Sequence, residues 1–215
     1  NGTVDGFALS GESVVVVGQY SGVRGLARPR LVAFGTTGDV TTWNPNANGE
    51  VYALATSGTQ VYVGGAFTSL GGMTRNYIGA VAENGTLDLT FNPDASINVY
   101  SFAVSGTTLY VGGGFSMIGG QPRFAIAGLD ATTGAATSWD PGANSNVRAL
   151  SLQGTTLYAG GDFTTFGGGA TRNHIASILT TSDTASTWNP DVTGTTVNAL
   201  ASTADTVYAG GNFTA

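Results

Sequence analysis

The fold is decided by residues 99–146, VYSFAVSGTTLYVGGGFSMIGGQPRFAIAGLDATTGAATSWDPGANSN. This stretch contains a strand with small residues, a second strand that ends in glycines, an arginine before a third strand, and a closing Trp-Asp-Pro. The same order of features occurs before it and after it. The chain is therefore a tandem array of one repeated unit.

The valine that opens each first strand aligns the units: Val4, Val51, Val99, Val147 and Val197, at distances of 47, 48, 48 and 50 residues. A period near fifty with several short strands per unit is typical of β-propeller blades. We predict an all-β fold, a β-propeller of four-stranded antiparallel blades. The predicted units are blade 1 at about 4–48, blade 2 at 51–98, blade 3 at 99–146, blade 4 at 147–196 and a half blade at 197–215.

The last unit holds only the first two strands of the repeat and stops just after Phe213. An uncovered half blade would expose unpaired strand edges, which finished proteins avoid. We therefore expect the chain to be part of a larger ring. A closed ring of four or five blades is the alternative.

Composition excludes several classes of function. Charged residues make up 9% of the chain and the formal net charge is −6, which argues against binding to nucleic acid phosphates. No run of 18 apolar residues is present, so no membrane-spanning helix is expected. The chain has no cysteine, which rules out disulfides and thiolate metal sites. Low charge with abundant Thr, Asn and Gly favours a secreted or cell-surface location.

Arginine recurs at one place in the unit, three residues before an aliphatic position of the third strand: Arg28, Arg75, Arg123 and Arg172. A guanidinium group bonds several carbonyl groups at once, which suits blade edges that lack strand partners. We therefore interpret these arginines as structural. The alternative is a ring of arginines that binds an anion.

Paired glycines end the second strands: Gly64-Gly65, Gly112-Gly113, Gly160-Gly161 and Gly210-Gly211. Glycines in a strand indicate a bulge or a close approach of another part of the chain.

In the first strands, alternation predicts valine and the small residues on one face and the variable and large residues on the other. The large residues are expected to pack between neighbouring sheets.

A large aromatic residue precedes Asn or Asp and then Pro at the end of each full unit: Trp43, Phe91, Trp139 and Trp188. Core packing explains a ring that recurs beside a strand-ending proline. The alternative is a platform on which sugar rings stack.

No catalytic or metal-binding pattern is present. His174 is the only histidine, so a histidine-rich metal site is impossible. The spacing of the carboxylates pairs no two of them for acid–base chemistry. We expect no enzyme activity, no cofactor and no metal. Three sequons match the N-glycosylation pattern, at Asn1, Asn84 and Asn212, although Asn84-Gly85 also fits a hairpin turn.

The unit Val-x-Ala-Leu…Leu-Tyr-Val-Gly-Gly-x-Phe-Thr…Arg…Ile-Ala…Trp-Asn-Pro resembles the bacterial propeller repeat called delta-sixty, over essentially the whole chain. The Gly-Gly-x-Phe motif with an arginine eight or nine residues after the phenylalanine carries most of this resemblance. Kelch blades are more loosely similar, and the outer repeats of fungal cortical polarity-marker proteins are distantly so. The resemblance implies a propeller within a large secreted or surface-anchored protein, and it transfers no catalytic residues.

The second residue of each first strand is the candidate ligand site: Asp5, Tyr52, Tyr100, Arg148 and Asn198. Packing residues repeat between blades, whereas residues that recognise an asymmetric ligand differ. Because equivalent strand ends converge on one opening of a propeller, we predict a binding mouth here. The alternative is a column that faces solvent and varies freely.

These observations predict a non-enzymatic binding or scaffold module of a secreted or cell-surface protein. Its partner would be a protein or a glycan at the propeller mouth, and further blades or domains of the parent chain are expected. A carbohydrate-binding, lectin-like propeller, or the accessory domain of a glycan-acting enzyme, is the alternative. A kelch-type copper oxidase is disfavoured because it needs cysteine and more than one histidine.

Overall fold

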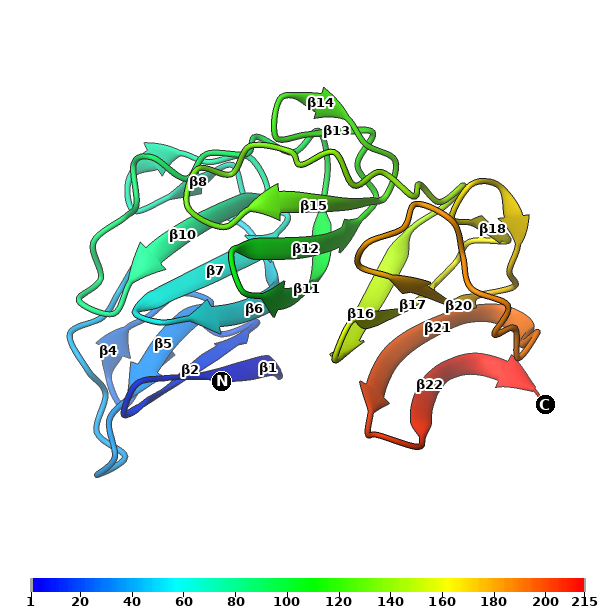
Figure 1. Cartoon of the computed structure of the whole chain (residues 1–215). Coiled ribbons are helices and arrows are strands. Elements are labelled where there is room, and N and C mark those ends of the chain that lie inside the picture. Colours follow the sequence, from blue (N-terminus) through cyan, green and yellow to red (C-terminus); the bar gives the residue numbers. More distant parts are fainter. Residues whose placement is uncertain (1, 215) are drawn as a thin grey trace.

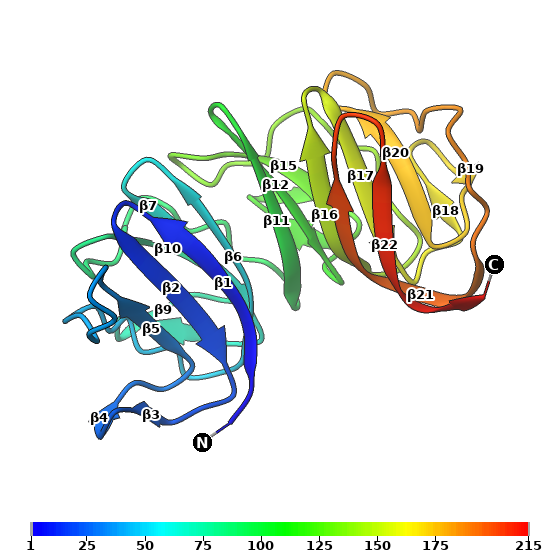
Figure 2. The same cartoon turned by 90° about the horizontal axis from the view of Figure 1, so that it is seen from below.

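Small antiparallel sheets follow one another along an open arc (Figures 1 and 2). The computed structural model describes residues 2–214, and these form strands, turns and loops but no helix. Each blade begins with the inner strand of its sheet. The first strands are β1 (Val4–Ser10), β6 (Val51–Ser57), β11 (Val99–Ser105), β16 (Val147–Gln153) and β21 (Thr193–Ser202). The repeat period and the all-β fold predicted from the sequence are confirmed.

The second strand lies in the middle of each full sheet and pairs with the first and the third. The second strands are β2 (Ser13–Gly18), β7 (Gln60–Gly65), β12 (Thr108–Gly113), β17 (Thr156–Gly161) and β22 (Val207–Thr214). The third strands are β5 (Leu31–Phe34), β10 (Ile78–Ala82), β15 (Ile126–Asp130) and β20 (Ile175–Leu179). Within the described residues the last sheet contains only β21 and β22.

A short hairpin connects the second strand to the third in blades 1 to 4. These hairpins are β3 (Gly22–Val23) with β4 (Leu26–Ala27), β8 (Ser69–Leu70) with β9 (Met73–Thr74), β13 (Met117–Ile118) with β14 (Gln121–Pro122), and β18 (Thr165–Phe166) with β19 (Ala170–Thr171). The residue between the hairpin and the third strand has a positive φ in every blade, at Arg30, Tyr77, Ala125 and His174.

The fourth strand differs from the sequence prediction, because it is reduced to one isolated bridge per blade. The bridges join Phe34 with Val40, Val81 with Leu87, Leu129 with Ala136, and Ile178 with Ala185. Three or four residues beyond each of these bridges the chain reaches the aromatic-Asn/Asp-Pro segment, where proline has no N–H to donate to a ladder. A fully paired fourth strand therefore does not form.

The repeated arginine supplies the bond that a longer fourth strand would make. In blade 2, Nη2 of Arg75 donates to the carbonyl of Asp88 at 2.9 Å, and Nη1 donates to the carbonyl of Thr74 at 2.9 Å. The N–H of Asp88 meanwhile donates to the carbonyl of Ala80 in the third strand. Arg28, Arg123 and Arg172 make the equivalent pairs of bonds. Each guanidinium thus bonds the shortened edge within its own blade.

A β-bulge near the start of the first strand corrects the predicted distribution of side chains. In blade 3 the register shifts between Val99 and Ser101, and the same shift occurs in the other blades. Because one extra residue intervenes, Val99 and the large residue Phe102 share the face toward the preceding blade. Simple alternation had placed them on opposite faces. The large residue does pack between sheets, as predicted.

In blades 2 to 4 both glycines of the pair are required by close approach. A Cβ atom on Gly64 would lie 2.6 Å from Cγ1 of Val99 and 2.8 Å from the ring of Phe102, both in the next blade. A Cβ atom on Gly65 would overlap the carbonyl oxygen of Glu50, directly before the bulged first strand. The first glycine therefore admits the next blade, and the second admits the bulge of its own blade.

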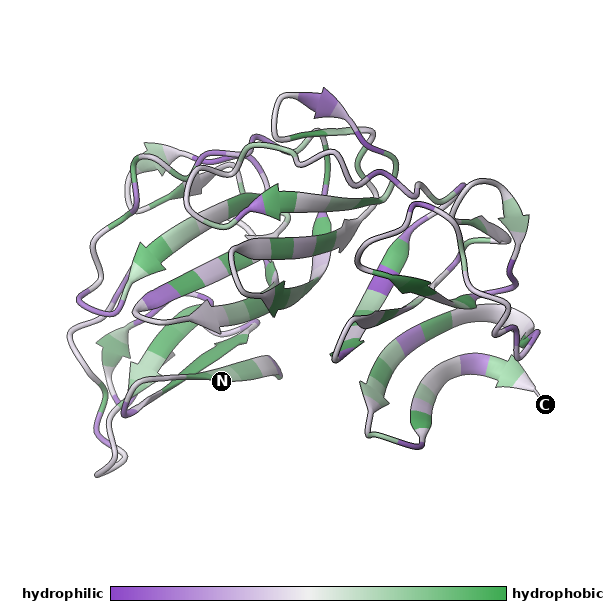
Figure 3. Cartoon of the chain, in the orientation of Figure 1, coloured by the Kyte–Doolittle hydropathy of each residue, from purple (hydrophilic) through white to green (hydrophobic). Residues whose placement is uncertain are grey.

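The core lies between neighbouring sheets, and hydrophobic residues recur along their strands (Figure 3). Trp43, Phe91 and Trp139 are buried, so the predicted core packing of the repeated aromatic is confirmed in these three blades. The indole Nε1 of Trp43 donates to the carbonyl of Ala82, and that of Trp139 to the carbonyl of Ser182, each in the next blade. Trp188, beside the two-stranded last sheet, is only half-buried.

Alanine substitutions within one glycine column test the packing between blades. A Cβ atom on Gly160 would lie 2.6 Å from Cγ1 of Val197, whereas on Gly210 it meets only Cβ of Ala199 at 3.9 Å. We expect Gly160→Ala to lower the free energy of unfolding by about 1–3 kcal/mol through overpacking. The matched control Gly210→Ala should change it by less than about 0.5 kcal/mol. Urea unfolding midpoints measure both, and equal effects would contradict the assignment.

Candidate functional site

Side chains at the start of neighbouring first strands meet one another along the inner side of the arc. The rings of Tyr52 and Tyr100 have centroids 5.6 Å apart and are tilted by 37°. Arg148 belongs to the blade that follows Tyr100. Its guanidinium carbon lies 5.4 Å from the centroid of the Tyr100 ring. Three blades thus contribute to one aromatic–aromatic–cation stack. We call Asp5, Glu50, Tyr52, Tyr100, Arg148 and Asp162 the inner row.

The tyrosine end of the inner row is bordered by carboxylates. The hydroxyl of Tyr52 donates to Oε2 of Glu50 at 2.6 Å. Burial raises the pKa of Tyr52 to about 12, and the bond to Glu50 and the nearby charge of Asp5 add to this effect. Tyr52 is therefore a neutral hydrogen-bond donor at physiological pH, and Glu50 and Asp5 place negative charge beside it.

The arginine end of the inner row is an ion pair. Nε and Nη2 of Arg148 donate to the two carboxylate oxygens of Asp162 at 2.7 and 2.8 Å. Asn146 donates to the same carboxylate at 2.9 Å. Burial by itself raises the pKa of Asp162, but the hydrogen bonds from Arg148 and Asn146 outweigh it and lower the pKa to about 2. Bonding to Asp162 in turn raises the pKa of Arg148.

The structure brings together four of the five candidate ligand residues predicted from the sequence. Tyr52, Tyr100 and Arg148 form the stack, and Asp5 lies close enough to influence the pKa of Tyr52. Asn198 is exposed on the last blade, where its Oδ1 accepts from Oγ1 of Thr196. The four repeated arginines do not join this row, because each bonds within its own blade.

Sequence reasoning missed Glu50 and Asp162. Both stand next to the columns that repeat: Glu50 precedes the opening valine, and Asp162 lies between the glycine pair and Phe163. Both columns vary from blade to blade, as the second-residue column does. A search for every variable position beside a repeated motif would therefore have found them.

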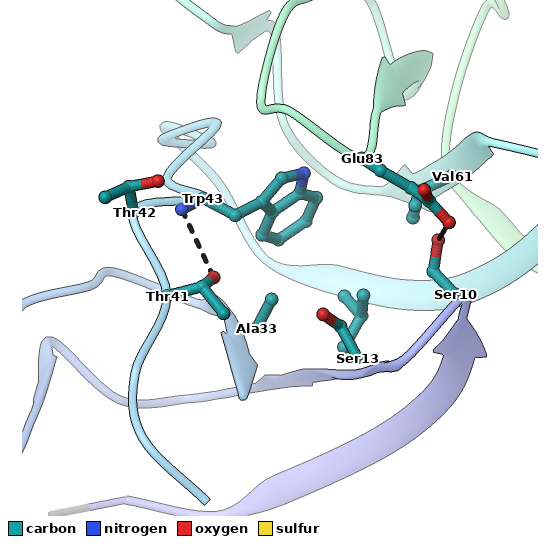
Figure 4. Close-up of a pocket in the computed structure, with 9 residues that line it drawn as sticks. Ser10, Ser13, Ala33, Thr41, Thr42, Trp43, Val61 and Glu83 are labelled. Carbon is teal, nitrogen blue, oxygen red and sulfur yellow. Dashed lines mark hydrogen bonds between the residues drawn. The ribbon is translucent and has the colours of Figure 1, made fainter. Parts of the chain in front are cut away.

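A small cavity of about 70 Å³ lies between blades 1 and 2 (Figure 4). It is lined by the indole of Trp43, and Oγ of Ser10 donates to Oε1 of Glu83 at its edge. Its origin is a substitution within the repeat, because Val15 stands where blades 2 and 3 carry the buried Tyr62 and Tyr110. The space equals about two water molecules. It is a packing defect rather than a ligand site.

A wider groove of about 670 Å³ separates blades 2 and 3 on the side of the hairpins. Nδ2 of Asn76 donates to Oδ1 of Asp94 on its wall at 2.7 Å, and Asn173 bonds Asp191 in the same way in blade 4. Because the same Asn–Asp hydrogen bond occurs in two blades, we interpret it as a structural contact of the repeat. The inner row, which differs in every blade, remains the stronger candidate.

Other chemistry-bearing positions fall outside the inner row. His174 is buried. Residues 2–214 contain no group of three or more His, Asp and Glu side chains placed to hold a metal ion, and no helix able to cross a membrane. Of the sequons, Asn84 lies in an exposed turn, where its Oδ1 accepts from the N–H of Thr86. Asn212 is exposed on β22, and Asn1 lies outside the described residues.

Solved structures share this fold. The computationally designed Ika8 protein matches at 16% identity with a TM-score of 0.62, over 96% of this chain and 55% of that chain. The designed Ika4 protein matches at 16% identity and a TM-score of 0.54, over 83% and 91%. The WD40 repeats of RRP9 match at 10% identity and a TM-score of 0.55, over 83% and 46%.

This chain therefore spans about half the length of Ika8 and of the RRP9 repeats. No protein-family model and no curated protein matches it. At such low identities the similarity shows the fold alone, a propeller scaffold of repeated antiparallel sheets.

The ion pair makes stability depend on pH in a defined direction. Because the folded-state pKa of Asp162, about 2, lies below the ordinary value near 4, ionised Asp162 stabilises the fold above about pH 4, and this stabilisation is lost as pH falls toward 2. Asp162→Asn should cost roughly 1–3 kcal/mol at neutral pH and almost nothing at pH 2. Thermal melts across this range measure the difference. Asp205→Asn, in the exposed turn before β22, is the control, and a pH-independent gap for Asp162→Asn would contradict the prediction.

Proposed function

We propose that this chain is a non-enzymatic binding module whose inner row holds a protein segment with basic side chains. The stack of Tyr52, Tyr100 and Arg148, bordered by carboxylates, is the observation that carries the proposal. The propeller scaffold supports it, because propellers present equivalent strand ends around one opening.

The charge of the inner row favours a cationic partner. Three carboxylates, Asp5, Glu50 and Asp162, stand against the single guanidinium of Arg148, which is already paired with Asp162. The whole chain is acidic as well, with a formal net charge of −6. Such a surface raises the local concentration of basic ligands and repels acidic ones.

The aromatic part of the inner row suits the same ligand. Lys and Arg side chains are attracted to the faces of tyrosine rings within about 6 Å, and the contact strengthens when it is partly shielded from water. Arg148 makes this contact with Tyr100 inside the chain. A ligand arginine or lysine beside half-buried Tyr52 would extend the stack toward Glu50 and Asp5.

The pattern of repetition separates these residues from the packing residues. The opening valine, the glycine pair and the arginine recur in the later blades because each meets the same neighbour. The residues of the inner row meet different neighbours and differ in charge and shape. This asymmetry is what recognition of a ligand without propeller symmetry requires.

A glycan is the second candidate ligand. Sugar rings are also held by tyrosine rings with amide and carboxylate groups beside them. Here Asn98 lies beside Tyr100, and Asn146 bonds Asp162. In that case the chain would be a lectin-like propeller or an accessory domain of a glycan-acting enzyme. The acidic balance of the inner row makes the basic protein segment the first choice.

We further propose that the module belongs to a secreted or cell-surface protein of the delta-sixty-type repeat family, with further blades or domains in the parent chain. The low proportion of charged residues and the Gly-Gly-x-Phe…Arg motif support this placement. Detection of the full-length protein in washed cells and in culture medium, beside a cytoplasmic marker, tests it. Retention in the cytoplasm would contradict it.

Titration calorimetry with short peptides rich in Lys and Arg, with acidic and neutral peptides of the same length, tests the proposed ligand. We expect binding of the basic peptides only, weakening as salt is added. Tyr52→Ala combined with Tyr100→Ala should weaken binding about tenfold or more, since this removes the stacking faces. Phe124→Ala, which truncates an exposed aromatic outside the inner row, should leave affinity unchanged.

Melting temperatures of the variants control for folding. Equal binding of acidic and basic peptides would contradict the proposal. Binding on a glycan array, lost in the double tyrosine variant and accompanied by no peptide binding, would establish the second candidate instead.

A further inference from the structure

Another polar groove, of about 360 Å³, lies between blades 1 and 2. Its walls are residues 19–21, Pro29 and Arg30 of blade 1, and Glu50, which directly precedes the first strand of blade 2. β2 is antiparallel to both β1 and β5, so Arg30, directly before β5, lies at the end of the blade where the first strand begins. The groove is therefore at the same end of the blades as the inner row, and Glu50 belongs to both.

The backbone holds Arg30 in a fixed position. Its φ is 65°, its N–H donates to the carbonyl of Tyr20, and its carbonyl accepts from the N–H of Gly18. The equivalent residues of the next three blades have the same backbone conformation and the same two bonds, although their side chains differ: Tyr77, Ala125 and His174. A rigid position with a variable side chain is the property that the residues of the inner row also have.

The guanidinium group of Arg30 is only partly bonded. Nη1 donates to the carbonyl of Ala47 at 3.1 Å, which fixes the orientation of the group. Within residues 2–214, Nε and Nη2 of Arg30 have no hydrogen-bond partner, and neither atom is buried. Each of the other six arginines bonds a carboxylate or two carbonyl groups.

The two unbonded atoms are the pair that binds a carboxylate elsewhere in this chain. In blade 4, Nε and Nη2 of Arg148 donate to the two oxygens of Asp162 at 2.7 and 2.8 Å. These N–H groups form a planar fork that matches the two oxygens of a carboxylate. Glu50 does not bind the fork of Arg30, because the two residues form no ion pair and Glu50 accepts from Tyr52 instead.

We infer that Arg30 is a carboxylate-binding subsite for the protein segment that the inner row holds. The inference rests on the proposed function and extends it, because the ligand then combines basic side chains beside Tyr52 and Glu50 with a carboxylate at Arg30. Since Glu50 borders both subsites, the basic residue and the carboxylate are close together in the segment. The net charge of −6 favours a single carboxylate over a more highly charged phosphate group.

The carboxylate is either the C-terminus of the segment or the side chain of an Asp or Glu next to its basic residues. Titration calorimetry with one peptide rich in Lys and Arg, in three forms, tests the inference and separates the two sources. The first form ends in a free carboxylate and the second in an amide. The third is amidated but has Glu as its last residue.

We expect the parent chain to bind the first form, the third form or both about threefold to tenfold more tightly than the second, because a bidentate charge-assisted contact is added. The form that gains affinity identifies the source of the carboxylate. Arg30→Gln should remove the gain and leave the affinity for the amidated second form unchanged, which shows that the variant is folded and its inner row intact. Arg30→Lys keeps the charge without the fork and should retain only part of the gain.

Arg24→Gln is the matched control. It removes the same charge from the same blade, at an exposed residue that pairs with Asp39 and does not line the groove. We expect it to keep the full gain.

Equal affinity of the parent chain for all three forms would overturn the inference. The proposed function would still stand if Tyr52→Ala combined with Tyr100→Ala weakened the binding of all three. A gain that persists in Arg30→Gln would place the carboxylate elsewhere, and an equal loss in Arg24→Gln would show an effect of overall charge; either result would overturn the inference. Binding of none of the three forms would contradict the proposed function and this inference together.

Discussion

The spacing of the blades depends on one contact, between the first glycine of each second strand and the opening valine of the next blade. At Gly64, Gly112 and Gly160 any side chain would enter the space of that valine. The absence of a side chain lets the glycine backbone contact the valine side chain of the next sheet directly. Close approach buries the opening valine of each later first strand and partly buries its large residue. It also sets the first strands side by side along the arc, which brings Tyr52 within stacking distance of Tyr100 and Tyr100 within reach of Arg148.

Two further devices keep each blade in the shape that this contact needs. The bulge after the opening valine turns the valine and the large residue toward the same neighbour, and the second glycine leaves room for the bulge. The repeated arginine bonds the carbonyl groups beyond the short fourth strand, so an edge without a full ladder is still satisfied. Because these positions carry the packing, the residues between them are free to vary. The inner row consists of such residues, and its acidic, aromatic character is the basis of the proposed basic ligand.

The repeat in the sequence was enough to predict the period, the all-β fold and the burial of the aromatic residue in blades 1 to 3. Each of these follows from a residue type that recurs at a fixed place. The bulge could not be predicted from alternation, because alternation assumes an unbroken pleat, and the faces of Val99 and Phe102 were therefore assigned wrongly. The predicted fourth strand was too long, because beyond one bridge per blade the arginine side chain bonds the carbonyl group that a strand ladder would otherwise pair. The column of Asp162 varies as the second-residue column does, but only the structure reveals that Arg148 is its partner.

A double-mutant cycle between Gly160 and Val197 tests the central contact most directly. Val197 is fully buried, so Val197→Ala alone destabilises the chain by removing packed methyl groups. If the two positions compete for one space, Gly160→Ala should cost less in the Val197→Ala background than in the parent chain. The account predicts a favourable coupling free energy of about 1 kcal/mol or more from urea unfolding of the four proteins. Additive effects within about 0.3 kcal/mol would contradict it, because they would show that the methyl group introduced by Gly160→Ala and the valine side chain do not meet.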